Sequence, residues 1–299
     1  MNKVFMAFAS GNKSVDEIEV KRYIGIAPVY VLDVNPNKAE LEKLYNTTMD
    51  KEPEYLGEVE VDGNKIPNVR IDFIVKTDAP RSNNIDFTSK VSFFIRKEYC
   101  YNRDKSKVQV IDKYGETAWV TVEQAKNKEI PVYSNGPAKI DKDYRPCFRG
   151  EENLIKFIRT YLGIPRVYVY NREDNSWNMR SNPSESEGRL DKILDYFNGD
   201  FSELKSIISL QKENKIKVMF GVRKTDDGKM YQTVFTEEFA SNSTKNYNNI
   251  DKELQNRLSN GAYSTTEFYV GDLKEYVVEA TDFTSTNTNK GSEDSTPWF

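Results

Sequence analysis

Alternation of apolar and polar residues predicts β-strands across the first half of the chain. Apolar residues recur at every second position from Val69 to Val75, which is typical of a strand with one buried face. Runs rich in aromatic and β-branched residues predict further strands at Arg22–Val34, Leu56–Val61, Lys90–Tyr101, Lys107–Ile111, Thr117–Val122 and Ile130–Tyr133. The turns at Asp62–Lys65 and Lys113–Glu116 join neighbouring strands as hairpins, and Asp-Gly is the strongest short-range hairpin signal.

Helical periodicity appears once in the first half and dominates after Pro137. Asn35 is expected to cap a short helix that ends at Asn46. Glu151–Leu162 has the apolar face of an amphipathic helix, and Gly163 suits its end. More helices are predicted at Leu190–Phe197 (after a capping-box pattern at Ser184 and Glu187), at Leu204–Ile208 (capped by Asp200) and at Ile250–Leu258. Strands between them are predicted at Arg166–Tyr170, Ile216–Arg223, Tyr231–Phe235, Phe268–Val270 and Tyr276–Val278, with a polar loop at Asn171–Gly188 that holds Trp177.

These elements predict an α+β fold that is mainly antiparallel β. Five or six strands over residues 20–135 suggest a small barrel or sandwich. An oligonucleotide/oligosaccharide-binding (OB) barrel fits this count, as do other small β folds. We therefore expect residues 1–280 to form one elaborated OB-like domain with helical insertions, β-rich at 20–135 and mixed α/β at 136–280. Residues 281–299 are too polar to bury a core, so we expect a disordered C-terminal tail.

Composition narrows the class of protein. Hydrophobic residues make up 37% of the 299 residues, charged residues 30%, and the mean hydropathy is -0.72. No apolar run approaches the roughly 20 residues that a membrane span needs. The first residues are too weakly apolar for a signal peptide, so a cytoplasmic protein is expected.

The chain contains no histidine, which removes most hydrolytic and zinc chemistry. Ser-His-Asp and Cys-His triads and His-containing zinc sites are excluded. Cys100 and Cys147 cannot build a four-thiolate zinc site, and no phosphate-cradling glycine motif occurs. We therefore expect no catalytic residues, no metal and no cofactor. A magnesium nuclease using Asp200 and Glu213–Lys215 is an alternative, although such spacings arise by chance in a highly charged chain.

Most of the candidate nucleic-acid-binding residues lie between Phe87 and Lys113. This segment has seven basic residues and three acidic ones. In the strand Lys90–Tyr101, aromatic residues alternate with basic ones, the mixture that a groove for single-stranded nucleic acid requires. The alternative is that Phe93, Ile95 and Tyr99 are core residues and the charges are merely solvated. The predicted DNA contacts are Phe94, Arg96, Lys97, Tyr99, Tyr101, Arg103, Lys105, Lys107, Trp119, Arg145 and Arg149.

The C-terminus combines acidity with aromatic residues. Glu293 and Asp294 precede Trp298 and Phe299, the last two residues. Large aromatics on a solvated tail are suited to a partner's pocket, with the terminal carboxylate available to a basic group. These four residues are the predicted partner-binding site, and a plain frayed terminus is the alternative.

Three stretches resemble single-stranded DNA-binding proteins of tailed phages, including crAss-like ones: Lys21–Asn46 (KRYIGIAPVYVLDVNPNKAELEKLYN), Tyr144–Pro165 (YRPCFRGEENLIKFIRTYLGIP) and Lys217–Phe235 (KVMFGVRKTDDGKMYQTVF). The ending SEDSTPWF is similar to the tails of that class. The resemblance implies an OB-fold core, sequence-independent binding of single strands during replication or recombination in the host cytoplasm, and a tail that meets polymerase, primase or helicase. This tail is only weakly acidic, and the zinc ligands of some phage versions are missing. A phage virion structural or packaged protein is the alternative function.

Overall fold

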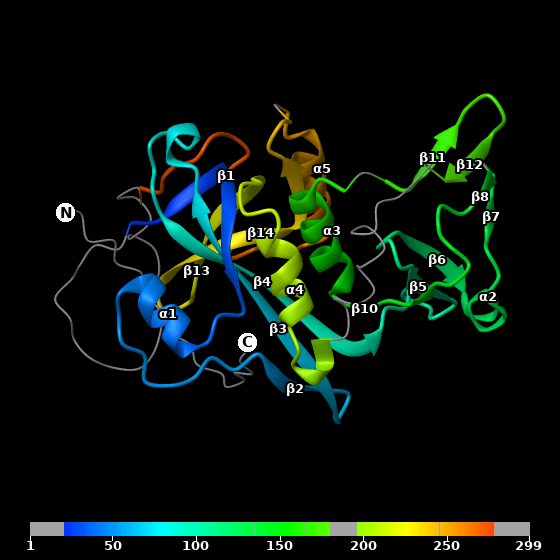
Figure 1. The fold of residues 1–299 in the computed structure, drawn as a ribbon, viewed down its shortest axis with the longest axis horizontal. Coiled ribbons are helices and arrows are strands. Elements are labelled where there is room, and N and C mark those ends of the chain that lie inside the picture. The colour runs from blue at the N-terminus through cyan, green and yellow to red at the C-terminus, as the bar shows by residue number, and fades with distance from the viewer. Residues whose placement is uncertain (1–20, 135, 165, 180–195, 245, 278–299) are drawn as a thin grey trace, which may run out of the picture.

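The computed structural model describes residues 21–134, 136–164, 166–179, 196–244 and 246–277. A curled, mainly antiparallel sheet with helices packed on it forms the larger body, and a smaller β-rich lobe stands beside it (Figure 1). The predicted α+β class with mainly antiparallel strands is therefore confirmed.

Five long strands form the central sheet in the spatial order β4-β3-β1-β13-β14, with antiparallel neighbours. Their bounds are β1 (Tyr23–Val34), β3 (Asn64–Thr77), β4 (Thr88–Tyr99), β13 (Ile216–Lys224) and β14 (Met230–Ser241). Strands β1, β3 and β4 lie side by side in chain order. After a long connection, β13 lies on the other side of β1, which is the order of a Greek key. Shorter strands extend the sheet: β2 (Leu56–Val61) beside β3, β10 (Phe148–Arg149) beside β4, β15 (Thr266–Phe268) beside β13 and β16 (Lys274–Glu275) beside β1.

The sheet curls into a half-barrel that α3 (Glu151–Leu162) closes. Cα atoms of β14 come within 8 Å of those of β4, and α3 packs against both strands. The ring of Phe157 on α3 lies 4.5 Å from that of Phe73, 5.5 Å from that of Phe93 and 5.1 Å from that of Phe239, centroid to centroid. Helix α3 has the predicted bounds, because its apolar face meets this core and Gly163 ends it with a φ of 67°.

Within the described residues, the remaining helices are α1 (Lys38–Tyr45), α2 (Val122–Asn127), α4 (Ser202–Ser209) and α5 (Asn248–Ser259), with 3₁₀ turns η1 (Ala79–Arg81) and η4 (Tyr196–Asn198). The predicted cap of α1 is wrong: Asn37 caps the helix by accepting from the Glu40 N–H at 2.9 Å. Asn35 instead accepts from the Asp72 N–H at 2.6 Å, which fastens the end of β1 to β3. The stop at Asn46 is confirmed.

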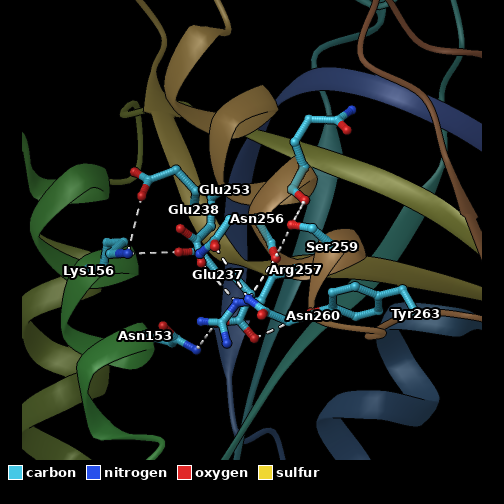
Figure 2. A network of polar contacts seen from close by, with 11 residues as sticks. Asn153, Lys156, Glu237, Glu238, Glu253, Asn256, Arg257, Ser259, Asn260 and Tyr263 are labelled. Atoms are coloured by element: carbon cyan, nitrogen blue, oxygen red, sulfur yellow. Dashed lines mark hydrogen bonds and ion pairs between the residues drawn. The ribbon is translucent and has the colours of Figure 1, made fainter.

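A polar network ties α3 and α5 to β14 (Figure 2). From α3, Asn153 donates to Glu237 at 2.9 Å and Lys156 pairs with Glu238 at 3.1 Å. From α5, Arg257 pairs with Glu237 at 2.8 Å and with Glu253 at 2.8 Å. Because each charge has a partner, the network is a structural cross-link that holds both helices on the strand.

The smaller lobe contains the strands that follow β4. It has a three-stranded sheet of β6 (Thr117–Thr121), β5 (Lys107–Ile111) and β9 (Arg145–Pro146), and two hairpins, β7 (Val132–Tyr133) with β8 (Gly136–Pro137) and β11 (Tyr168–Asn171) with β12 (Ser176–Met179). Val110, Val120 and Tyr144 belong to its own buried core. The barrel is thus not built from residues 20–135, because β1 pairs with β13 from the second half. Trp177, predicted in a loop, lies in β12.

Some predictions fall outside the described residues. These are the capping-box pattern at Ser184 and Glu187, most of the helix Leu190–Phe197, and the tail 281–299. None of the helices within the described ranges combines the length and apolar composition that crossing a membrane requires.

Candidate functional site

Strand β4 carries many of the predicted contacts, and its two faces differ. Val91, Phe93 and Ile95 point into the half-barrel and are buried, which confirms the core interpretation of Phe93 and Ile95. Phe94 points to the outer face of the sheet and is 50% exposed. An aromatic ring of this size on the convex side of a sheet has no core to enter and is available to a ligand.

The outer face of β3 and β4 gathers this ring with arginines. Arg70 lies directly opposite Phe94 in the strand register, and Arg96 follows Phe94 on the same face. On the other side of β4, Arg149 of β10 is the register partner of Arg96 and pairs with Glu98 at 3.3 Å. We call Arg70, Phe94, Arg96 and Arg149 the outer-face patch.

The positive charge of this patch is only partly neutralised. Asp72, 3% exposed, has one carboxylate oxygen 3.2 Å from Nε of Arg70 and 3.3 Å from Nζ of Lys90. The single carboxylate of Asp72 therefore pairs with two cations, Arg70 and Lys90. The Arg70 guanidinium also lies 5.4 Å from the centroid of the Tyr55 ring. In the part of the chain that the structure describes, no carboxylate comes within 4 Å of Arg96.

Lys97 and Tyr99 lie on the opposite face of β4 from Phe94 and Arg96. Tyr99, 43% exposed, stacks on Phe148 with centroids 5.5 Å apart and planes at 21°. Phe148 meets Phe197 edge-on at 5.1 Å, and Nζ of Lys97 lies 5.6 Å from the Phe197 centroid. Since successive residues of a strand point to opposite faces, the predicted residues form two groups and not one continuous groove.

The turn between β4 and β5, together with the first residue of β5, carries three further predicted cations, and we call Arg103–Lys107 the basic turn. Arg103, Lys105 and Lys107 are exposed, and none has a carboxylate within 4 Å among the described residues. Asp104 lies between them, but its carboxylate accepts from the Ser106 hydroxyl at 2.6 Å and from the Ser106 N–H at 3.0 Å. With three cations and one carboxylate, Arg103–Lys107 carries a net charge of about +2 at the base of the smaller lobe.

Tyr101 and Trp119 belong to the smaller lobe and are partly exposed. Trp119 lies directly opposite Gln109 on the β5–β6 hairpin. Gln109 donates to Glu152 on α3 at 2.6 Å, so this face of the hairpin is turned towards the larger body. Trp119 thus extends the candidate surface across the junction of the two lobes.

Arg145 has a structural partner. Its guanidinium donates to both carboxylate oxygens of Glu151, at 2.6 Å and 3.0 Å, and Glu151 is 0% exposed. The same carboxylate accepts from the Tyr196 hydroxyl and the Phe148 N–H, each at 2.8 Å. Because a buried carboxylate needs this cation, we assign Arg145 to the junction of β10 and α3 and not to the candidate surface.

Sequence reasoning missed Arg70, Lys90 and Tyr55. Arg70 occupies a polar position between Val69 and Ile71 in the apolar alternation, which already marks it as an outer-face residue. Its position opposite Phe94 depends on the register between β3 and β4, which no local pattern specifies. Tyr55 lies outside any predicted strand, so only the folded chain shows its contact with Arg70.

The residues proposed for a nuclease have other contacts. Lys215 pairs with Asp78 at 2.8 Å, Asn214 donates to the Tyr161 carbonyl at 2.8 Å, and Asp200 accepts a backbone hydrogen bond in its own turn. Among the described residues, no group of three or more acidic, cysteine or histidine side chains is placed to hold a metal ion.

Comparison with family models, curated proteins and solved structures finds no match to this chain. The predicted partner-binding residues Glu293, Asp294, Trp298 and Phe299 lie outside the described residues.

Proposed function

We propose that the protein binds single-stranded DNA without reading its sequence, through the outer-face patch and the basic turn that follows β4. The observation that carries this proposal is Phe94, a half-exposed ring flanked by Arg70 and Arg96 on the outer face of the sheet. A base can stack on the ring while the two guanidinium groups reach the neighbouring phosphates. Stacking and charge together bind single strands and are indifferent to sequence.

The strand order supports an OB-like assignment within this proposal. An OB fold is a five-stranded, partly open Greek-key barrel that binds oligonucleotides on the face of its second and third strands. The central sheet has five long strands in a Greek-key order, and α3 closes its opening. The second and third long strands are β3 and β4, the strands that carry the outer-face patch.

Lys97 and Tyr99, on the opposite face of β4 from Phe94, extend the proposed path of the DNA. Tyr99 presents an exposed ring already stacked on Phe148, and Arg103, Lys105 and Lys107 follow within the next eight residues. A DNA strand leaving Phe94 would pass beyond the end of β4 to reach them, with Trp119 farther along its path. Stacked bases each contribute about 1–3 kcal/mol, so two or three rings and a few phosphates suffice for tight binding.

We further propose a phage replication or recombination role in the host cytoplasm, without catalysis. The C-terminal residues Glu293, Asp294, Trp298 and Phe299 would recruit a polymerase, primase or helicase. Deleting Ser295–Phe299 should leave the affinity for DNA unchanged and abolish the pull-down of such a partner. Loss of DNA binding in this truncation would contradict the separation of the two roles.

Fluorescence titration tests the DNA-binding proposal. Wild type should bind a labelled oligothymidine more tightly than a duplex of the same length at moderate salt. Phe94→Ala should lose about 1–3 kcal/mol, or about five- to 150-fold in affinity. Tyr231→Ala is the matched control, because Tyr231 is a partly exposed tyrosine on β14, away from the patch.

Two outcomes would overturn this function. Equal loss in Phe94→Ala and Tyr231→Ala would remove the patch from the binding site. No preference for the single strand, together with defined rings or shells in size-exclusion chromatography, would favour the virion structural protein instead.

A further inference from the structure

A second surface, independent of DNA binding, lies at the outer edge of β2. The hairpin formed by β2 and the first residues of β3, Leu56–Asn68, projects from the half-barrel (Figure 1). We call it the β2–β3 arm. Among the described strands, β2 pairs with β3 and with no other. Its second edge therefore presents unpaired backbone groups, which are a template for an added strand.

The register shows which backbone groups face outwards. Val61 and Asn64 are register partners that flank a two-residue turn. In such a hairpin the flanking residues form a hydrogen-bonded pair, and hydrogen-bonded pairs then recur at every second position along the arm. The Arg70 N–H donates to the Tyr55 carbonyl at 2.8 Å, and the same alternation makes Tyr55 and Arg70 a hydrogen-bonded pair. Glu58 lies opposite Pro67, which has no N–H to donate, and this pair is one of the non-hydrogen-bonded ones.

It follows that Leu56, Glu58 and Glu60 direct their N–H and C=O groups away from β3. Three consecutive outward positions form a short ladder. The next hydrogen-bonding position towards the turn would be Asp62, which lies in the turn itself with a φ of 50°. The free edge is therefore limited to Leu56–Val61.

The side chains of the arm divide by charge. Glu58 and Glu60 share one face with Lys65, which pairs with Glu58 at 3.7 Å between highly exposed side chains. Val59 lies opposite Ile66 on the other face, and both are half-exposed. An added strand would therefore meet carboxylates on one face and apolar side chains on the other.

A second copy of this chain does not suit the edge. Antiparallel pairing of two β2 strands brings the outward residues of each copy together, so Glu58 would face Glu58 or Glu60 of the other copy. Like charges directly opposite one another destabilise a strand pair. A partner strand that alternates basic and apolar residues would place its cations against these glutamates and its apolar residues beside Val59.

We propose that the outer edge of β2 accepts an extended segment of a partner protein, with alternating basic and apolar residues, as an additional strand. Backbone hydrogen bonds to Leu56, Glu58 and Glu60 would supply the affinity. The glutamates and the valine face would select the side-chain pattern, as in other strand additions.

The test uses the full chain and two blocked octapeptides, one alternating Lys and Val and the other alternating Glu and Val. The Lys-Val peptide should bind and shift the backbone amide signals of Leu56, Glu58 and Glu60 in NMR spectra, while the Glu-Val peptide should not. Glu58→Pro should abolish binding, since it removes an outward N–H that β3 does not use. Glu58→Lys should weaken binding several-fold without altering the backbone.

Glu173→Lys is the matched control, because it makes the same charge change at an exposed turn of the smaller lobe. Binding that persists in Glu58→Pro, or that falls equally in Glu173→Lys, would show a non-specific charge effect and overturn the proposal. So would no binding of either peptide. A wild-type dimer that Glu58→Pro dissociates would assign the edge to a second copy instead.

Discussion

Glu151 is a carboxylate with no exposed surface, at the first position of α3. It accepts hydrogen bonds from the Arg145 guanidinium, the Phe148 N–H and the Tyr196 hydroxyl. These donors come from β9, β10 and η4, so a single side chain fixes three segments at the end of the half-barrel. The same residue explains why Arg145, an attractive phosphate contact in the sequence, has a structural role.

Replacing Glu151 should be costly, because the Arg145 guanidinium, the Tyr196 hydroxyl and the Phe148 N–H lose their charged acceptor. Glu151→Gln is expected to lower the free energy of unfolding by about 1–3 kcal/mol, as measured by urea denaturation, since the Arg145 side chain is partly exposed to solvent. The double variant Arg145→Met/Glu151→Leu should recover much of this loss, since neither charge remains. A single variant within about 0.5 kcal/mol of wild type would contradict the assignment.

Asp112 makes a pH-dependent contribution to stability. Burial raises its pKa to about 6 and Glu116 adds to the rise, although backbone N–H groups of Asp141, Glu116 and Tyr114 oppose it. A raised pKa means that the folded state holds the proton more tightly than the unfolded state. The stabilising contribution of Asp112 is therefore present in full below about pH 4 and is lost as the pH rises through about 6. The free energy of unfolding changes by about 3 kcal/mol over the whole range.

The variant Asp112→Asn isolates this effect, because carboxylates that do not interact with Asp112 titrate equally in both proteins. The stability of wild type relative to Asp112→Asn should fall by about 2 kcal/mol between pH 4 and pH 7, because the rest of the change lies below pH 4. Urea denaturation at several pH values measures this difference. A difference that stays constant with pH would contradict the raised pKa.

At the scale of elements, the predictable parts of the fold are those with local signals. The bounds of α3 follow from its apolar periodicity and Gly163, and the β2–β3 hairpin follows from Asp62-Gly63. The pairing of β1 with β13 joins segments about 190 residues apart and has no local signature, so the barrel could not be located from the sequence. For the same reason Phe94 could be identified from its own strand, whereas Arg70, its neighbour across the register, could not.

Gly150 controls the junction between β10, α3 and β4. Its φ is 91°, and a Cβ there would lie 2.2 Å from the Phe94 carbonyl oxygen. Gly150→Ala should therefore destabilise the fold by more than about 2 kcal/mol, through backbone strain and this clash. It should also weaken DNA binding, since the strained atom belongs to Phe94.

Gly57→Ala is the control for this substitution. Gly57 lies on β2 with ordinary backbone geometry, and a Cβ there would meet nothing within 4 Å. The free energy of unfolding of the Gly57→Ala variant should stay within about 0.5 kcal/mol of wild type. Equal effects of the two substitutions in thermal or urea denaturation would show that the close approach at Gly150 is tolerated.

At the scale of the whole molecule, the two lobes are joined by buried polar contacts. Arg159 of α3 donates to Glu116 of the smaller lobe at 2.8 Å, and the same carboxylate oxygen accepts from the Val167 N–H at 3.0 Å. The Gln109 N–H donates to the Cys100 carbonyl at 2.8 Å, which places Trp119, the register partner of Gln109, near the end of β4. The candidate surface therefore depends on the lobes keeping this arrangement.

The distribution of charge makes a final prediction about binding. The chain has a net charge of -4, yet Arg96, Lys97, Arg103, Lys105 and Lys107 have no carboxylate within 4 Å in the described parts of the chain. If about four of these cations contact phosphates, the slope of log affinity against log salt for single strands should be about -3. Fluorescence titrations between about 50 and 300 mM salt measure this slope.

Neutralising part of the basic turn should reduce that slope without removing the stacking contribution. Lys105→Gln/Lys107→Gln is expected to make the slope shallower by about 1.4, since each phosphate contact on a single strand contributes about 0.7. Phe94→Ala should instead lower the affinity at every salt concentration and leave the slope unchanged, because an uncharged ring releases no counterions. If the lysine pair left the slope unchanged, the path of the DNA would not run from the outer-face patch into the smaller lobe.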